Sequence, residues 1–194
     1  MIRRPSRAQI DEGILDSAAA LFARRGIKDT AVQAIADDVG YSKAAVLQRF
    51  GTKALLLERV IARCDELSAS LLASVSDLAD GPERDEKAVT ELTDIALANP
   101  GFVAMLISAA TNQRDTELAE GMEPVGKTAM RAFGLGEWDP DTADLERTVR
   151  VAGCLAAVSL LSTLYQPAMS ATTARPLIIA AAYATLHGPG PSLG

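Results

Sequence analysis

Apolar residues recur at helical spacing along most of the chain. They form stripes in the stretches 9–25, 54–79, 83–98, 102–112, 116–133, 141–165 and 174–186. Asp80-Gly81-Pro82 interrupts this pattern, because glycine and proline end helices. Pro124 could break the stretch 116–133, and Pro176 is expected in the first turn of the last helix. The pattern predicts an all-α fold.

Two short helical patterns lie between Thr30 and Lys53. Thr30 precedes the first pattern and has the hydroxyl of a typical N-cap residue. Gly40 follows that pattern, at a position where glycine tolerates the left-handed conformation of a helix C-terminus. Ser42 is expected to cap the second pattern, which runs to Phe50. Two helices joined by a short glycine-containing turn are a helix-turn-helix motif.

The second helix of this motif has two different sides. Val46 and Phe50 lie one helical turn apart and are expected to point inward. The other side is thin and carries Lys43, Ala44, Leu47 and Gln48. Such a helix fits the major groove of B-DNA, where side chains reach base edges. The alternative is an ordinary helical hairpin whose polar side faces solvent.

The run from Ile10 to Val60 resembles the DNA-binding domain of the TetR family of bacterial transcriptional repressors. The pattern G-x-S-K-x-x-x-x-x-x-F-x-x-K-x-x-L, from Gly40 to Leu56, is the most specific part of this resemblance. Further matches lie before and within it: Ile14, Ala18, Leu21, Phe22, Gly26, Thr30, Val32, Ile35, Ala36, Val39 and Val46. The resemblance implies a three-helix DNA-binding domain (1–53) and a helical effector-binding and dimerisation domain (54–187). We expect residues 188–194 to form a disordered tail.

The resemblance also implies which residues contact DNA. A lysine at the position of Lys53, near a helix N-terminus, contacts a phosphate in the family, and the helix N–H groups add to the attraction. Leu47 stands where the family often has a tyrosine, and it could contact only a thymine methyl group. Gln48 falls at a variable position from which glutamine can pair with adenine. The expected DNA-contacting residues are Arg3, Arg4, Thr30, Ser42, Lys43, Ala44, Leu47, Gln48 and Lys53.

Charge is divided unequally along the chain. Residues 1–60 hold ten lysines and arginines against seven aspartates and glutamates, a formal charge of +3, whereas residues 61–194 carry −9. An acidic protein binds nucleic acid only through a basic part of its surface. Residues 1–8, with Arg3 and Arg4, are therefore either a basic arm for phosphate or the minor groove, or a disordered tail.

Few residues are arranged for catalysis or metal binding. We find no glycine-rich phosphate loop, no metal-ligand spacing and no Ser/Cys/His set, and the one histidine, His187, is expected at a helix C-terminus. Cys64 and Cys154 lie far apart, and buried free thiols are favoured over a disulfide. We therefore expect no enzymatic activity and no cofactor.

The chain shows no charge-free apolar run of about 18 residues, and no secretory signal follows its basic start. We expect a cytoplasmic protein that does not enter a membrane.

The last two helical stretches are apolar on more than one side and rich in small residues. We expect them to form a four-helix interface between two copies of the chain, the alternative being two core helices of a monomer. The resemblance supports the dimer, since the last two helices form the interface in TetR-like proteins. Such a dimer would hold its recognition helices about 34–36 Å apart and read a palindrome. The expected interface residues are Val151, Leu155, Val158, Ile178, Ile179 and Tyr183.

The middle helices, from Leu67 to Phe133, would enclose an effector pocket. Methionine and aromatic side chains suit a lipophilic small molecule, although each is also a common core residue. The candidate lining residues are Phe102, Met105, Met122, Met130, Phe133, Trp138 and Tyr165.

These features predict a ligand-responsive repressor that acts as a homodimer on a palindromic DNA operator. An effector would change the separation of the two DNA-binding heads, because it would prefer a different spacing from the one that DNA prefers. Two alternatives are a DNA-binding dimer without a small-molecule effector, and a helical protein that binds a protein partner and has lost DNA recognition. Leu47 makes the last alternative conceivable.

Overall fold

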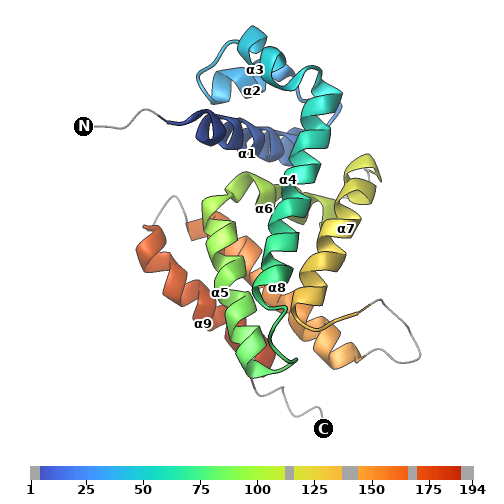
Figure 1. The fold of residues 1–194 in the computed structure, drawn as a ribbon, viewed down its shortest axis with the longest axis vertical. Coiled ribbons are helices and arrows are strands. Elements are labelled where there is room, and N and C mark those ends of the chain that lie inside the picture. The colour runs from blue at the N-terminus through green and yellow to red at the C-terminus, as the bar shows by residue number, and fades with distance from the viewer. Residues whose placement is uncertain (1–4, 112–115, 137–143, 166–169, 189–194) are drawn as a thin grey trace. The chain divides into compact units, whose positions relative to one another are not determined.

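The computed structural model describes residues 5–111, 116–136, 144–165 and 170–188. Within these residues the chain forms helices and no strand (Figure 1). The helices are α1 (Arg7–Arg25), α2 (Val32–Asp38), α3 (Lys43–Phe50), α4 (Lys53–Ser74), α5 (Pro82–Ala98), α6 (Pro100–Thr111), α7 (Thr116–Ala132), α8 (Leu145–Tyr165) and α9 (Ala171–His187). The expected all-α fold is confirmed.

The first helix begins at Arg7, before its hydrophobic pattern, because Ser6 and Gln9 form a capping box. The Ser6 backbone N–H donates to Gln9 Oε1 at 2.8 Å, and the Gln9 N–H donates to Ser6 Oγ at 3.2 Å. The last helix also begins earlier than expected, since Ser170 caps it. Pro176 therefore lies inside α9 and not in its first turn. Because proline has no backbone N–H, it removes one helical hydrogen bond at this interior position.

Thr30 does not cap α2, so this prediction is wrong. The N-cap residue of α2 is Ala31, which makes no side-chain hydrogen bond. The Thr30 hydroxyl instead donates to the Leu21 carbonyl at 3.1 Å and to the Gly26 carbonyl at 2.8 Å. Thr30 therefore bonds to carbonyls in the last part of α1 and at its C-cap, and its side chain is buried.

The seventh helix runs through Pro124 without the expected break. Its Gly121 lies close to α4, because a Cβ at this position would be 2.8 Å from Ile61 Cδ1. Close packing of this kind can hold a helix that a proline weakens, and the sequence pattern alone does not reveal it.

The helices pack into two compact units. The first comprises residues 1–66 and 99–123, and the second comprises residues 67–98 and 124–194. This division differs from the predicted boundary after residue 53 because α6 packs along α1 and joins the first unit (Figure 1). The functional boundaries at residues 53 and 187 stay predictions.

The first unit has a core of mostly aliphatic side chains around Phe22. Its largest fully buried members are Ile14, Leu21, Phe22, Ile35, Val46, Leu56, Val60, Met105 and Leu118. Asp16 of α1 holds the start of α6, since its carboxylate accepts the Gly101 N–H at 2.9 Å and the Phe102 N–H at 3.2 Å. A Cβ on Gly101 would lie 1.9 Å from the Asp16 carbonyl oxygen, so only glycine allows this approach. Burial raises the pKa of Asp16 and outweighs these two hydrogen bonds.

In the second unit, Arg84 pairs carbonyls near the ends of two helices. Its guanidinium donates at 2.8–3.2 Å to the carbonyls of Val75, Leu78, Arg131 and Ala132. The first two follow the last turn of α4, and the other two end α7. Arginine suits this position because its five N–H donors can bond to several carbonyls at once.

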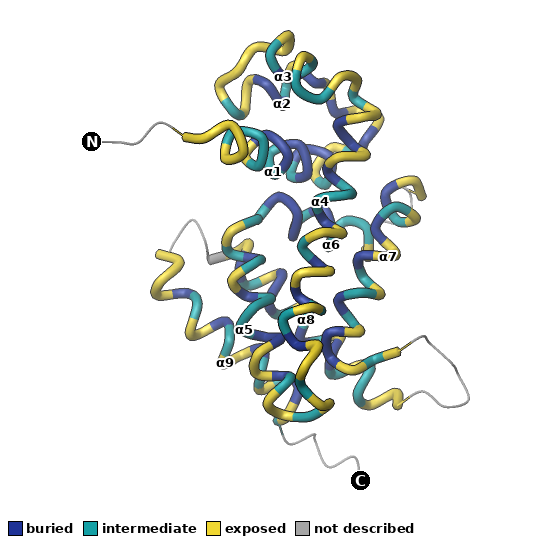
Figure 2. Tube along the Cα trace, viewed as in Figure 1, coloured by how far each residue is buried: buried dark blue, intermediate teal, exposed yellow. Residues whose placement is uncertain are grey.

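The fifth helix packs against both α8 and α9 (Figure 1). By length and composition, α8 could cross a membrane, but helices inside water-soluble proteins meet the same criteria. Figure 2 shows buried and exposed positions alternating along α9. Only 28% of the apolar stretch of α8 is buried within the chain. Much of its apolar surface is therefore open to a partner.

Candidate nucleic-acid interface

The turn between α2 and α3 has the backbone geometry of a helix-turn-helix. Gly40 adopts a φ of 72°, and the Tyr41 N–H donates to the Ala36 carbonyl at 2.8 Å, as in a Schellman motif. Ser42 Oγ then accepts the Ala45 N–H at 3.1 Å, which confirms the predicted N-cap. The chain thus leaves α2 and enters α3 within a short, hydrogen-bonded turn.

The third helix, eight residues long, presents one face to solvent. Lys43, Ala44 and Gln48 lie on this face with Leu47, while Val46 on the opposite side is fully buried. The face combines an ammonium group, methyl groups and a carboxamide. These groups match a phosphate, a thymine methyl and an adenine edge.

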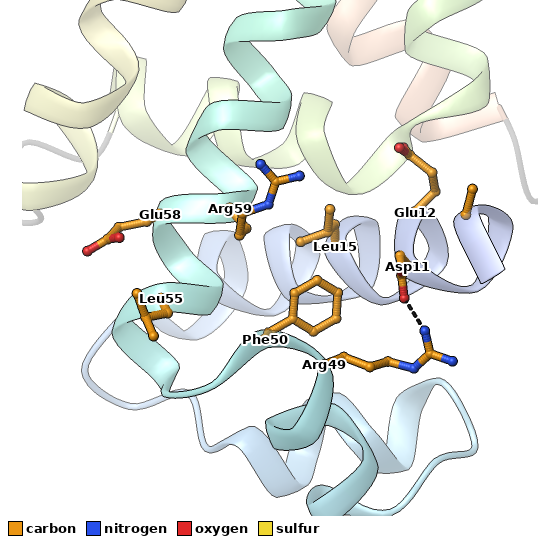
Figure 3. Close-up of a pocket in the computed structure, with 9 residues that line it drawn as sticks. Asp11, Glu12, Leu15, Arg49, Phe50, Leu55, Glu58 and Arg59 are labelled. Atoms are coloured by element: carbon orange, nitrogen blue, oxygen red, sulfur yellow. Dashed lines mark hydrogen bonds and ion pairs between the residues drawn. The ribbon is translucent and has the colours of Figure 1, made fainter.

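Arg49, at the end of α3, forms an ion pair with Asp11 of α1 (Figure 3). Beside this pair, an open cavity of about 530 Å³ lies between α1, the end of α3 and the start of α4. Its lining carries apolar groups and charges of both signs: Ala8, Asp11, Glu12, Leu15, Arg49, Phe50, Leu55, Glu58 and Arg59. This mixed charge does not favour a polyanion, and no described residue expected to contact DNA or an effector lines the cavity.

Two residues expected to contact DNA make hydrogen bonds inside the protein. The Lys53 ammonium donates to the carbonyls of Ile27 at 2.7 Å, Lys28 at 3.1 Å and Thr30 at 3.0 Å. The Thr30 hydroxyl points into the same unit, as described above. Both side chains therefore hold the loop between α1 and α2.

Of the other residues expected to contact DNA, Ser42 belongs to the described residues, whereas two arginines of the N-terminal segment do not. Ser42 is exposed, although its hydroxyl caps α3, and Arg3 and Arg4 lie outside the described residues. Tyr41 was not among the expected contacts, yet it is 37% exposed in the turn before α3. An aromatic residue directly before an N-cap serine was the available sequence signal. A phenol hydroxyl there can donate to a phosphate.

The expected effector residues are divided between the two units, and most are packed in a core. The residues exposed by 5% or less are Phe102, Met105 and Met122 in the first unit and Phe133 in the second. Met130 is half-buried. Trp138 and the Tyr165 side chain lie outside the described part of the chain.

Half of the expected interface residues need correction. Val151, Val158 and Ile178 are exposed by 2% or less, so their side chains belong to the core of the second unit. Leu155 is half-buried. The apolar side chains that face solvent on these helices are Leu145 (62% exposed), Val149 (69%), Leu160 (53%), Leu164 (58%) and Leu177 (60%). Because α8 is apolar on both sides, its periodicity does not distinguish the inward side from the outward side.

The other two expected interface residues, Ile179 and Tyr183, lie on α9 and are half-buried. The ring of Tyr183 lies against that of His187, with 4.6 Å between the ring centroids. His187 is in the last turn of α9, at the helix C-terminus that the sequence predicts for it.

The two cysteines are free and buried, as expected, and they belong to different units. Burial raises the pKa of the Cys64 thiol and of the Cys154 thiol to about 12. Neither thiol therefore forms the reactive thiolate near neutral pH. Among the residues that the structure describes, no three His, Cys, Asp or Glu side chains are grouped to hold a metal ion.

The helix-turn-helix lies in a stretch that matches a known family. Residues 14–60 match the family described as "Bacterial regulatory proteins, tetR family". The resemblance to the TetR family is confirmed. The match runs from α1 into α4 and includes the exposed face of α3, so the TetR-type segment contains the candidate interface.

Solved structures of TetR-type regulators share the fold of this chain. A TetR-like transcriptional regulator from Rhodococcus sp. RHA1 has a TM-score of 0.55 at 18% identity, covering 96% of this chain and 100% of that one. The TetR-family regulator PfmR from Thermus thermophilus has a TM-score of 0.55 at 21% identity, with coverages of 91% and 98%. The fatty acid degradation regulator FadR from Bacillus halodurans has a TM-score of 0.56 at 14% identity, with coverages of 96% and 98%. No curated protein matches the chain in a sequence comparison. At such identities the likeness shows a TetR-type fold over nearly the whole chain.

Proposed function

We propose that this protein is a DNA-binding transcriptional regulator, a cytoplasmic repressor that acts as a homodimer on a palindromic operator. The observation that carries the proposal is the exposed face of α3, where Lys43, Ala44 and Gln48 project from a helix that Ser42 caps. A short helix of this kind enters the major groove of B-DNA. The +3 charge of residues 1–60, beside −9 for the remainder, supports binding through this part of the chain.

The side chains on this face have separate roles in the proposal. Gln48 would pair with the N6 and N7 atoms of an adenine and so supply base preference. Ala44 would contact a thymine methyl group, and Lys43 would neutralise a phosphate. Leu47 lacks the tyrosine hydroxyl that the family often has, and the exposed phenol of Tyr41 would supply a hydroxyl for the backbone.

The proposed dimer uses the solvent-facing apolar side chains of α8 and α9. Leu145, Val149, Leu160 and Leu164 recur along one side of α8 at helical spacing, and each is more than half exposed in the single chain. A continuous apolar face of this kind is typical of a protein interface. A two-fold contact would pair it with the same face of a second copy, in a four-helix arrangement.

We also propose a small, lipophilic effector that binds the helical domain and changes the separation of the DNA-binding heads. One observation favours a second candidate, a DNA-binding dimer without an effector. Phe102, Met105, Met122 and Phe133 already fill protein cores. A thermal-shift screen of lipophilic compounds separates these candidates, because only an effector site predicts a compound that raises the unfolding temperature.

A selection from random duplex DNA tests the main proposal. We expect enrichment of an inverted repeat whose half-sites are centred about 10 bp apart. The enriched duplex should bind roughly 1,000-fold more tightly than a scrambled duplex at the same salt concentration. Equal affinity for the two duplexes would contradict sequence-specific binding and would favour a protein that binds a protein partner instead.

A further inference from the structure

We propose that Lys53 is a positioning residue of the DNA-binding domain and not a phosphate ligand. Its ammonium group holds the loop between α1 and α2 against the start of α4, and so fixes the base on which α2 and α3 pack. This inference rests on the proposed function. It gives Lys53 a different role from the phosphate contact that the TetR resemblance implies.

The geometry at Lys53 leaves no donor for a phosphate. A lysine ammonium has three N–H donors. Three backbone carbonyls take them, those of Ile27 at 2.7 Å, Thr30 at 3.0 Å and Lys28 at 3.1 Å. The bonds to Ile27 and Thr30 are part-buried, so a phosphate oxygen that displaced either carbonyl would remove one of its partners away from bulk water. The longest bond, to the exposed Lys28 carbonyl, is the one for which a phosphate would compete first.

The loop itself explains why a cation is needed there. Gly26 ends α1 with a φ of 83°, and the following residues turn their carbonyls toward the protein. Thr30 Oγ1 pairs the Leu21 and Gly26 carbonyls. The Lys53 ammonium donates to the carbonyls that follow in the loop, those of Ile27, Lys28 and Thr30. Two side chains thus bond to five carbonyls, that of Leu21 within α1 and those of Gly26, Ile27, Lys28 and Thr30 in the loop before α2.

The start of α2 depends on this loop. The N-cap residue Ala31 offers no side-chain acceptor, so α2 begins without the usual cap. Its first backbone bonds run from the Ala34 and Ile35 N–H groups to the Ala31 carbonyl at 3.0 and 3.4 Å. Thr30, directly before Ala31, is held through both its hydroxyl and its carbonyl. Releasing Lys53 should therefore loosen the start of α2 first.

Amide hydrogen exchange on the DNA-free protein tests the positioning role. Lys53→Gln removes the charge, and Lys53→Arg keeps it but replaces a compact ammonium by a planar guanidinium that cannot reach three converging carbonyls in the same way. In both variants we expect exchange at Gly26, Ala34 and Ile35 to become about ten-fold faster or more. The Gly51 amide, which bonds to the Leu47 carbonyl at 2.8 Å, is the internal control and should not change. Wild-type exchange rates in both variants would overturn the proposal.

The salt dependence of DNA binding tests whether the same ammonium also binds phosphate. Lys43→Gln, on the exposed face of α3, should reduce the slope of log affinity against log salt by about one. Lys53→Gln should lower affinity while keeping the wild-type slope. A Lys53→Gln slope reduced by about one, or a Lys53→Arg variant with wild-type affinity and wild-type exchange, would overturn the proposal. If the wild-type protein bound no duplex, the proposed function would fail, and the exchange rates alone would still decide the role of Lys53 in the loop.

Discussion

Asp85 of α5 and Arg147 of α8 form an ion pair inside the second unit, with 2.5 Å between Oδ1 and Nη2. Asp85 is 1% exposed, and His187 Nε2, at the end of α9, lies 3.0 Å from its other carboxylate oxygen. Arg147 also donates to the Phe133 carbonyl at 2.9 Å. A carboxylate so deeply buried is tolerated only with partners of this kind, so the pair determines how these helix ends meet.

Arg147→Met should destabilise the protein far more than Arg175→Met. The first change leaves Asp85 buried without its cation, at an expected cost of about 3 kcal/mol in the free energy of unfolding. Arg175 also pairs with an aspartate of α5, Asp94, at 2.5 Å, but both side chains are more than 40% exposed and water can replace the lost partner. Urea denaturation of the two variants makes the comparison. Equal losses would contradict the role assigned to the Asp85 pair.

Asp16→Asn and Asp16→Ala should differ in the direction of their effects. Burial raises the pKa of Asp16 above its ordinary 3.8, so the native state binds this proton more tightly than the unfolded chain. This contribution to stability is complete below about pH 3.8 and is lost as the pH rises through the native pKa. At pH 7, asparagine still offers an oxygen to the Gly101 and Phe102 N–H groups and carries no buried charge. Asp16→Asn should therefore be at least as stable as the wild type, whereas Asp16→Ala should lose about 1–3 kcal/mol.

Urea denaturation between about pH 3.5 and 7.5 checks the sign of this effect. The stability of Asp16→Asn relative to the wild type should increase as the pH rises through the native pKa. A constant difference, or one that increases toward acid pH, would show that burial of the charge is not the cause.

Leu160→Glu should convert the proposed dimer to a monomer. Leu160 is 53% exposed on α8, and a carboxylate there would be buried against a second copy without a partner. Leu55→Glu is the matched control, because Leu55 is similarly exposed, at 47%, but lies at the start of α4 in the first unit. Sedimentation equilibrium should find a monomer for Leu160→Glu and a dimer for the wild type and for Leu55→Glu. Dimers in all three would place the contact elsewhere.

Helical periodicity, caps and breakers were enough to predict much of the fold. Local rules predict the cap at Ser42, the turn at Gly40 and the inward direction of Val46. Caps, turn glycines and helical periodicity depend only on residues nearby in the sequence. Local rules failed where tertiary contacts decide. Thr30 has a hydroxyl suited to an N-cap, but two carbonyls at the end of α1 take it.

The candidate site shows the same limit. The exposed face of α3 could be predicted, because one side of that helix is apolar and the other is not. Val151 and Val158 could not be assigned to the inward side of α8, whose two sides are both apolar. The direction of the Lys53 side chain depends on carbonyls more than 20 positions away in the chain, which no spacing rule reveals.

Lys43→Ala and Gln48→Ala should weaken DNA binding in different ways. Loss of Lys43 should lower affinity for all duplexes and reduce the salt slope by about one. Loss of Gln48 should cost about 1–3 kcal/mol on the preferred duplex and relax base preference at one position in each half-site. Lys87→Ala, at an exposed position of α5, is the control and should bind as the wild type does. Fluorescence anisotropy with duplexes substituted at single positions would distinguish these outcomes, and equal effects from all three variants would contradict the assigned roles.

The most direct test of whether the exposed face of α3 reads DNA is hydroxyl-radical footprinting on the selected duplex. It compares the wild type with Ala44→Glu. Ala44 is exposed, so a glutamate there should leave the fold intact while it repels the phosphates and bases of the groove. We expect two protected half-sites about one helical turn apart for the wild type, and none for a folded Ala44→Glu protein. A wild type that protects no nucleotides, or an Ala44→Glu variant that protects the same nucleotides as the wild type, would contradict this role of α3.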